Sequence, residues 1–285
     1  MLDAGIKFSF FNPLTVRRPW GFHLRNHRKL CIIDGTWGFI GSLNISSEYK
    51  RWRLKKLEWI DNQLKVTGPA VNHLQTVFAE DWEFSTGESL TGEKYFPPPK
   101  TDGACVVQLL PTGPDEYEHT LEKILMTMVH AARKRVTMLT PYFVPTDAVA
   151  LALEAAAHRG VTVDILLPKR SDDWLVDLAA RSWYRDLLEG GANLYLSQSA
   201  FNHSKVVTVD GLVSLSGSAN MDERSFRLNF ECSAIIYNEG ISTEFVASFD
   251  KSKAEANQIK LADIDSLGIF ERIRDGFFRL LSPLL

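Results

Sequence analysis

Cysteine is scarce in this sequence. The 285 residues contain three cysteines, Cys31, Cys105 and Cys232, and no two of them form a Cys-x-x-Cys pair. An odd, dispersed set does not build a disulfide framework, and it does not supply the clustered thiols of a structural zinc site. We therefore expect a reducing compartment or buried thiols, and no structural zinc site.

Long apolar runs and excess positive charge are missing as well. No run of 18 apolar residues is present, and the first residues, MLDAGIKFSFF, lack the basic start and cleavage site of a signal peptide. Any membrane association is therefore expected to be peripheral. With 32 Lys and Arg against 35 Asp and Glu, the net charge is −3. No global positive field attracts DNA or RNA, so we expect no nucleic-acid partner.

A chain of this length suggests two domains, at about 150 residues per domain. The clearest boundary is GEKYFPPPKTDG, residues 92–103, where three consecutive prolines favour an extended linker. We expect a first unit over 1–91, a second over 104–250, and a C-terminal tail over 251–285.

After the linker, strand-like and helix-like segments alternate. The pattern predicts strands over 104–110, 135–140, 161–168 and 193–197, and helices over 115–133, 147–158 and 172–188. Such alternation favours an α/β fold with a mostly parallel sheet. The segments 204–210 and 212–218 flank an Asp-Gly turn and predict a hairpin, and 230–237 reads as a further strand.

The sequence contains an internal repeat. The segment HRKLCIIDG from His27 is matched by HSKVVTVDG from His203, and each copy continues into Gly-Ser-x-Asn fourteen residues after its histidine. Several polar residue types repeated in register indicate a duplicated unit. In the second unit 99 residues (104–202) precede the histidine, against 26 in the first, a difference of 73. We therefore expect the first domain to begin midway, with an incomplete sheet and an exposed edge.

The repeated motif has the composition of a phosphate site. Residues two apart on a strand share one face, so His27 lies beside Lys29, and His203 beside Lys205. Lysine is a poor metal ligand at neutral pH, but two such cationic pairs would clamp a phosphate. The following Gly-Ser-x-Asn segments would add hydrogen-bond donors from Ser42, Asn44, Ser218 and Asn220.

Two histidines at one phosphate permit a covalent transfer in two steps. One imidazole attacks phosphorus, while the other donates a proton to the leaving oxygen and later deprotonates the incoming alcohol. Each histidine needs a partner on its far nitrogen. Asp61 and Glu231, on the following strand of each half, are the candidates. This chemistry requires no cofactor.

Asp34 and Asp210 close the motif in each half. Their offset of seven from the histidine puts them on the opposite strand face, at an Asp-Gly turn. Periodicity therefore predicts a turn-forming role for both.

His-x-Lys-x4-Asp repeated with Gly-Ser-x-Asn resembles the phospholipase D superfamily and, more narrowly, the bacterial cardiolipin synthases. Further segments that carry the resemblance are TGPAVNHLQTVFAEDWE, TPYFVPTDAVALALEAAAHRGVTVDILLP and GSANMDERSFRLNFE. It implies a pseudo-twofold pair of α/β/α sandwiches, the first incomplete here, that share one metal-free active site. Members usually begin with two membrane-spanning helices and a full first sandwich, which this sequence does not show.

The resemblance also implies an activity and a location. Two phosphatidylglycerol molecules would give cardiolipin and glycerol through a phosphohistidine, at an anionic membrane surface of a bacterial cell. The family's nucleophile maps to His27 and its acid/base to His203, and its motif aspartates, counted with the active site, map to Asp34 and Asp210. Two alternatives stay open: a hydrolase of the same superfamily acting on phospholipid or nucleic acid, and an inactive fragment that binds membrane.

Two further segments suggest a membrane contact. The run KRWRLKK, residues 50–56, reads either as a solvated loop or as a contact with anionic lipid. In the tail, apolar residues from Ile269 to Leu281 recur near one helical face. This pattern predicts either a helix packed on the second sandwich or an amphipathic anchor in the bilayer surface.

Overall fold

The computed structural model describes residues 2–13, 24–47, 58–100, 103–115, 118–198 and 200–280. Its elements, in chain order, are η1 (Leu2–Ala4), β1 (Leu30–Ile33), β2 (Trp37–Gly41), β3 (Glu58–Ile60), β4 (Gln63–Val66), α2 (Ala70–Thr86), β5 (Val106–Thr112), α3 (Thr120–Ala131), β6 (Arg135–Leu139), β7 (Phe143–Val144), α4 (Asp147–His158), β8 (Thr162–Pro168), α5 (Trp174–Glu189), β9 (Asn193–Ser197), β10 (Ala200–Asn202), β11 (Val206–Val209), β12 (Val213–Gly217), β13 (Met221–Asp222), α6 (Glu223–Arg227), β14 (Glu231–Tyr237), α7 (Glu239–Ala254), β15 (Ala256–Ile259), α8 (Leu261–Asp265) and α9 (Ile269–Arg279).

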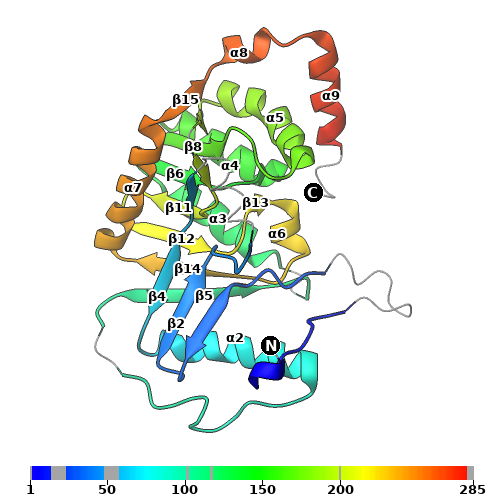
Figure 1. The fold of residues 1–285 in the computed structure, drawn as a ribbon. Coiled ribbons are helices and arrows are strands. Elements are labelled where there is room, and N and C mark those ends of the chain that lie inside the picture. Colours follow the sequence, from blue (N-terminus) through cyan, green and yellow to red (C-terminus); the bar gives the residue numbers. More distant parts are fainter. Residues whose placement is uncertain are drawn as a thin grey trace.

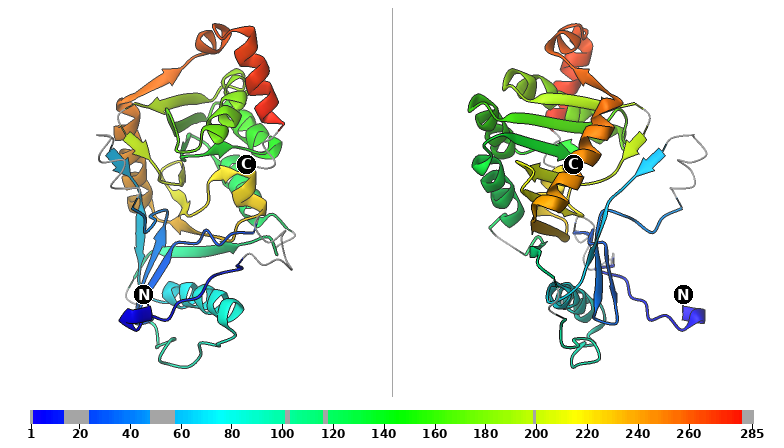
Figure 2. Two further views of the ribbon diagram at one scale, coloured as in Figure 1. Left: turned by 45° about the vertical axis from the view of Figure 1, so that its right-hand side comes forward. Right: turned by 90° about the vertical axis from the view of Figure 1, so that its left-hand side faces the viewer.

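The second half is a three-layer α/β/α sandwich. Its sheet has eight strands in the order β15-β9-β8-β6-β11-β12-β14-β5. Helices α3, α4 and α5 cover one face and α7 covers the other (Figures 1 and 2). The largest core cluster, which includes Leu125, Leu153 and Ile165, lies between the sheet and the three helices. The α/β fold expected from the sequence is confirmed.

The expectation of a mostly parallel sheet is wrong. Of the seven neighbouring strand pairs, two are parallel, β6–β8 and β8–β9. The other five pairs are antiparallel. The hairpin at Asp210-Gly211 places β12 antiparallel to β11, and β11 itself runs antiparallel to β6. Strands β14, β5 and β15 each pair antiparallel with their neighbours β12, β14 and β9. Alternating βα segments dictate parallel pairing only where a crossover helix joins the strands.

Side-chain caps set the starts of the long helices. The Thr146 hydroxyl accepts from the Val149 amide, so α4 begins at Asp147 and has the bounds expected from the sequence. The Asp173 carboxylate accepts from the Leu175 amide, and α5 accordingly begins at Trp174, two residues later than expected. A cap residue keeps extended backbone itself, which explains the shift.

The first half has a small sheet of three strands in the order β1-β2-β4, covered by α2. Ile40 of this sheet and Leu74 of α2 share a core cluster with Cys232, Ala234 and Ile236 of β14. The two halves therefore pack against each other through this shared cluster, and the small sheet lies below the large one in Figure 1.

The proline-rich segment between α2 and β5 forms no helix or strand in its described residues. It packs against the first-half turn, since a Cβ added to Gly35 would lie 2.5 Å from the Pro97 ring. Among the described residues, no helix is long and apolar enough to cross a membrane.

Candidate active site

Each motif histidine is held by backbone of the other half. The His27 amide donates to the Phe230 carbonyl at 2.8 Å, and the His203 amide donates to the Ile60 carbonyl at 2.7 Å. The carbonyl in each case belongs to the residue immediately before a carboxylate of the opposite repeat, Glu231 or Asp61. Short parallel pairings, β10–β3 and Asn26–Phe230, support these contacts.

The side chains pair crosswise as well. His27 Nδ1 lies 2.9 Å from both carboxylate oxygens of Glu231, and His203 Nδ1 lies 3.0 Å from Asp61 Oδ2. A carboxylate accepts, so each Nδ1 carries the proton and, in the neutral imidazole, each Nε2 carries the lone pair. The two acids expected from the sequence do contact the histidines, but each serves the histidine of the other half.

A serine of the same half as each acid completes this pattern. The Ser42 hydroxyl donates to Asp61, and the Ser218 hydroxyl donates to Glu231 Oε2 at 2.5 Å. Burial alone would raise the pKa of Asp61, but the hydrogen bond from His203 and the one from Ser42 hold it below its ordinary value. For Glu231, burial is likewise outweighed by His27 and Ser218, so its pKa is also lowered. Both acids are therefore ionised at neutral pH.

The lysines of the motif couple the two half-sites electrostatically. Lys29 Nζ donates to the His27 carbonyl and Lys205 Nζ to the His203 carbonyl, each at 2.8 Å. Burial lowers the pKa of Lys29 to about 8 and that of Lys205 to about 7. The charge of Lys29 also lowers the pKa of Lys205 and of His203. The two cationic pairs thus share one electrostatic environment.

The two histidines differ in environment. The His203 side chain is 7% exposed, against 30% for His27. The Trp59 ring, 5.1 Å from that of His203, and Phe201 cover it. Burial, together with the charge of Lys205, lowers the pKa of His203 to about 4, and Lys205 Nζ donates to its Nε2 at 3.1 Å. Without a ligand, His203 is therefore neutral.

Asp34 and Asp210 lie at the Asp-Gly turns, with φ of +52° and +54°. Both Asp210 carboxylate oxygens accept backbone N–H groups, from Arg133 at 2.9 Å and from Lys134 and Arg135 at 2.8 Å. Seven residues of extended chain separate Asp210 from His203, about 23 Å. The structure thus does not bring Asp210 to the histidines; its contacts are with the backbone that leads into β6.

The remaining candidates, Asn44 and Asn220, follow the two serines. Asn44 is half-buried in the segment after β2. Asn220 is 5% exposed, and its Oδ1 has no hydrogen-bond partner among the described residues. The run over residues 50–56 lies outside the described residues.

Two asparagines were missed by the sequence analysis. Asn229 Nδ2 donates to Glu231 Oε1 at 3.1 Å, and strand alternation two residues before Glu231 was the available signal. Asn62 accepts from the Ser42 hydroxyl at 3.0 Å and from the Lys205 amide at 3.3 Å, and its Nδ2 donates to Ser216 at 2.6 Å. Asn62 occupies the place after the acid where the second half has Cys232, so the repeat carried no signal for it.

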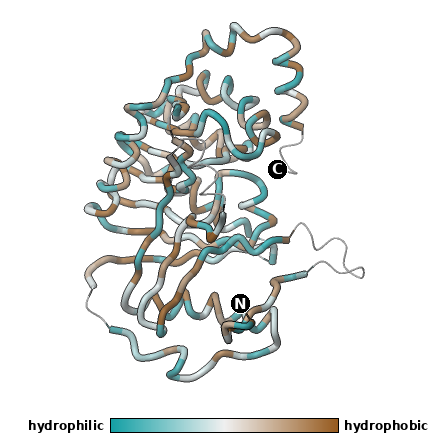
Figure 3. Tube along the Cα trace, viewed as in Figure 1, coloured by the Kyte–Doolittle hydropathy of each residue, from teal (hydrophilic) through white to brown (hydrophobic). Residues whose placement is uncertain are grey.

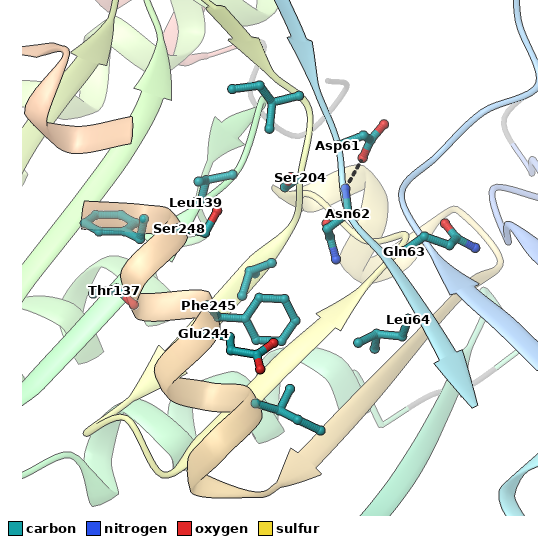
Figure 4. A pocket seen from close by; sticks show the side chains of 14 residues that line it. Asp61, Asn62, Gln63, Leu64, Thr137, Leu139, Ser204, Glu244, Phe245 and Ser248 are labelled. Atoms are coloured by element: carbon teal, nitrogen blue, oxygen red, sulfur yellow. Dashed lines mark hydrogen bonds between the residues drawn. The ribbon is translucent and has the colours of Figure 1, made fainter. Parts of the chain in front are cut away.

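A cavity of about 290 Å³ lies beside this site, between β4 and α7. Figure 4 shows Asp61 and Asn62 at one side of it and Glu244, Phe245 and Ser248 on the helix opposite. Its lining includes Asp61 and Ser204 but neither histidine. Over the described residues, no group of three or more His, Cys, Asp or Glu side chains is placed to hold a metal ion.

Comparison with known proteins gives concordant results. A family model described as cardiolipin synthase, PLD-like domain, matches residues 125–253. The cardiolipin synthase of Alkalihalophilus pseudofirmus is 38% identical over 288 residues, 99% of this chain and 57% of that protein. The cardiolipin synthase of Geobacillus sp. (strain WCH70) is 39% identical, with the same coverage. The chain thus spans little more than half the length of these curated relatives.

Among solved structures, phosphatidylserine synthase of Haemophilus influenzae matches 92% of this chain and 72% of its own, with a TM-score of 0.67 and 14% identity. That likeness shows the fold. The family model and the curated relatives show that this chain carries a phospholipase D-like domain. This domain is of the cardiolipin synthase type, as the repeated motif had indicated.

Proposed function

We propose that this site transfers a phosphatidyl group from one phosphatidylglycerol to the glycerol hydroxyl of another, which forms cardiolipin and releases glycerol. The observation that carries the proposal is the reciprocal pairing of the two motif histidines with the two carboxylates, His27 with Glu231 and His203 with Asp61. The family names of the relatives support the choice of substrate.

In the first step, His27 is the nucleophile. Its Nδ1–H is held by Glu231, so the Nε2 lone pair is directed away from the acid, and its side chain is the more exposed of the two. Attack of Nε2 on phosphorus forms an N–P bond and breaks the bond to the headgroup glycerol oxygen. His203 gives its Nε2 proton to that oxygen, and glycerol leaves.

His203 must gain this proton when substrate binds. A phosphodiester anion near His203 and Lys205 favours the charged forms of both and therefore raises both pKa values. Lys205 then donates to a phosphoryl oxygen in place of His203 Nε2. Protonation of the acid is thus coupled to the arrival of the phosphate.

In the second step, His203 acts as base. It removes the proton of the acceptor hydroxyl, whose oxygen attacks the phosphohistidine. The N–P bond breaks, cardiolipin is released, and both imidazoles return to their starting states. Lys29 and Lys205 stabilise the charge that develops on the phosphoryl oxygens.

The membrane is the proposed location, because both substrates are lipids. We also retain Asn44 and Asn220 as proposed phosphate-binding side chains, and we assign Asp34 and Asp210 to the turns rather than to the reaction.

Lipid mass spectrometry after incubation with phosphatidylglycerol vesicles tests the function, with the His203→Ala variant as control. Cardiolipin formed by the unmodified chain alone supports transfer. Phosphatidic acid in its place would mean that water outcompetes the alcohol and that the chain is a hydrolase. No product from either chain would overturn catalysis by this chain.

A further inference from the structure

Helix α9 packs on α5 through a charged face. Asp275 is 5% exposed, although it is a carboxylate. Arg279 bonds Asp186 of α5 at 2.5 Å and lies 4.0 Å above the Trp183 ring. One aromatic side chain, Phe278, also lies on this otherwise charged face, where its ring contacts that of Trp174 in an edge-on arrangement.

The apolar face of α9 points the other way. Ile269, Phe270, Ile273, Phe277 and Leu280 are exposed by 70, 84, 63, 56 and 75%. At 100° per residue, these five positions fall within an arc of about 100°. Figures 1 and 3 show α9 at the outer end of the molecule, remote from the first half.

This orientation is the reverse of that of an ordinary surface helix, which buries its apolar stripe and exposes its charges. Five large apolar side chains form one stripe, and Phe278 joins Phe277 of this stripe to Trp174, which lies at the start of α5 and is 65% exposed, so that the stripe and Trp174 form one apolar patch. A patch of this kind marks an interaction surface. We call these six residues the α9 patch.

A chain of contacts leads from the α9 patch toward the active site. Trp174 follows Asp172 by two residues, and Asp172 accepts from the Tyr142 hydroxyl. Tyr142 directly precedes β7, which pairs with β13, where Val144 lies opposite Asp222. Asp222 is close enough to His27 and Glu231 for their charges to change its pKa.

Arginines also border the α9 patch. Arg272 and Arg274 flank the apolar arc, one on each side; Arg272 donates to backbone carbonyls and Arg274 pairs with Asp275, while Arg279 is held on the packed face by Asp186. Arginines beside an apolar stripe of Phe, Ile and Leu, with a Trp at its border, are typical of helices that lie flat in the bilayer interface.

We propose that the α9 patch docks on the surface of an anionic phospholipid bilayer, with α9 parallel to the membrane plane, and so holds the chain at the membrane that contains its lipid substrates. This inference rests on the proposed function for the choice of a lipid partner. The other candidate occupant, a second copy of this chain, becomes an outcome of the test.

Flotation with vesicles of phosphatidylglycerol and phosphatidylcholine is the experiment. The test variants are Ile273→Glu and Phe270→Glu. The matched control is Leu151→Glu on α4, because Leu151 is 64% exposed and Ile273 is 63% exposed. Thermal unfolding of all four chains checks that folding is unchanged, and sedimentation velocity without lipid gives their oligomeric states.

We expect the unmodified chain and Leu151→Glu to float, and each α9 variant to lose at least tenfold in vesicle affinity. Equal flotation of the α9 variants and the control would overturn the proposal. So would a lipid-free dimer of the unmodified chain that Ile273→Glu converts to a monomer, because the patch would then be a self-association surface.

Turnover separates this inference from the proposed function. On phosphatidylglycerol dispersed in detergent, Ile273→Glu should keep its cardiolipin synthesis, while on vesicles it should lose it. A chain without turnover in detergent would contradict the proposed function and leave the flotation result to decide on the α9 patch.

Discussion

The two halves carry the same motif in very different surroundings. In the second half, β11 has strand neighbours on both sides, β6 and β12, and β14 lies between β12 and β5. In the first half, the described sheet ends at β1 and β4, the counterparts of β11 and β14. Yet both histidines are held by the same set of contacts. The site is therefore specified by the crosswise contacts between repeats rather than by the completeness of either sheet.

The two histidines differ in how deeply these surroundings bury them. His203 is enclosed by aromatic rings and bonded by Lys205, whereas His27 is more exposed and its lysine keeps the higher pKa. Duplication followed by unequal burial is thus a way to derive two chemical roles, nucleophile and acid/base, from one motif.

The largest effect is expected from the histidines themselves. His27→Ala and His203→Ala should each lower kcat for cardiolipin formation by about 10⁴. They should differ on a phosphodiester with a p-nitrophenol leaving group, which departs without an acid. His203→Ala should still release a burst of p-nitrophenol as the phosphohistidine forms, and His27→Ala should release none. If only the His27→Ala variant gave a burst, His203 would be the nucleophile and His27 the acid/base.

The crosswise pairing makes the next prediction. Glu231→Gln should slow the p-nitrophenol burst by about 10²–10³, because it removes the charge that stabilises the His27 imidazolium and lets an amide N–H face Nδ1, which favours the wrong tautomer. Asp61→Asn should leave the burst intact and slow the second step, because it acts through His203. Stopped-flow kinetics measures both phases. The opposite assignment, with Asp61→Asn slowing the burst, would mean that each acid serves the histidine of its own half.

Local features of this site were predictable from the sequence, and associations across the repeat were not. Strand period placed His27 with Lys29 and Asp34 on the opposite face, and the acids followed from the need of each histidine for a partner. Which acid meets which histidine depends on how two units dock, and no spacing within one unit carries that information. The pKa differences arise from burial, which the repeat itself does not determine.

The same limit applies to the fold. Helix α4 was predicted with its observed bounds from the sequence pattern, whereas the antiparallel additions of β5 and β15 depend on long-range pairing. For α9, periodicity predicted an apolar stripe, but the ion pair of Arg279 with Asp186 decides which face turns inward.

A smaller effect should appear in proton uptake. At pH 7.5, Lys205, with a pKa of about 7, is mostly neutral, and Lys29, with a pKa of about 8, is mostly charged. An anion raises both pKa values and that of His203, so binding takes up protons: about three-quarters of one at Lys205 and about one-quarter at Lys29, in addition to the proton that His203 gains.

Calorimetry of sulfate binding in buffers of different ionisation enthalpy measures this uptake, because sulfate itself binds no proton at this pH. Lys205→Met should remove most of the lysine contribution to the uptake, and Lys29→Met should remove its minor part. The lysine contribution should also rise as pH increases from 6 to 7.5. An uptake that is equal in the two variants would mean that the half-sites are electrostatically alike.

The smallest effect concerns the two turn aspartates. Asn tolerates the positive φ that both positions have, so Asp210→Asn and Asp34→Asn preserve the turns. Asp210→Asn removes the charge that accepts three backbone N–H groups leading into β6, which should cost about 1 kcal/mol and lower Tm by about 2–4 °C. Asp34 is exposed, and in the described sheet β1 is an edge strand with no counterpart of β6 beside it. Asp34→Asn should therefore leave Tm unchanged.

Cardiolipin formation by the same two variants then decides between the two interpretations of these aspartates. If they serve the turns, kcat stays within a factor of two in both, since each carboxylate is about 23 Å of extended chain from its histidine. A loss of a hundredfold or more in Asp34→Asn, at unchanged Tm, would instead return that carboxylate to the reaction. The contrast between the halves would then extend from the histidines to the whole motif.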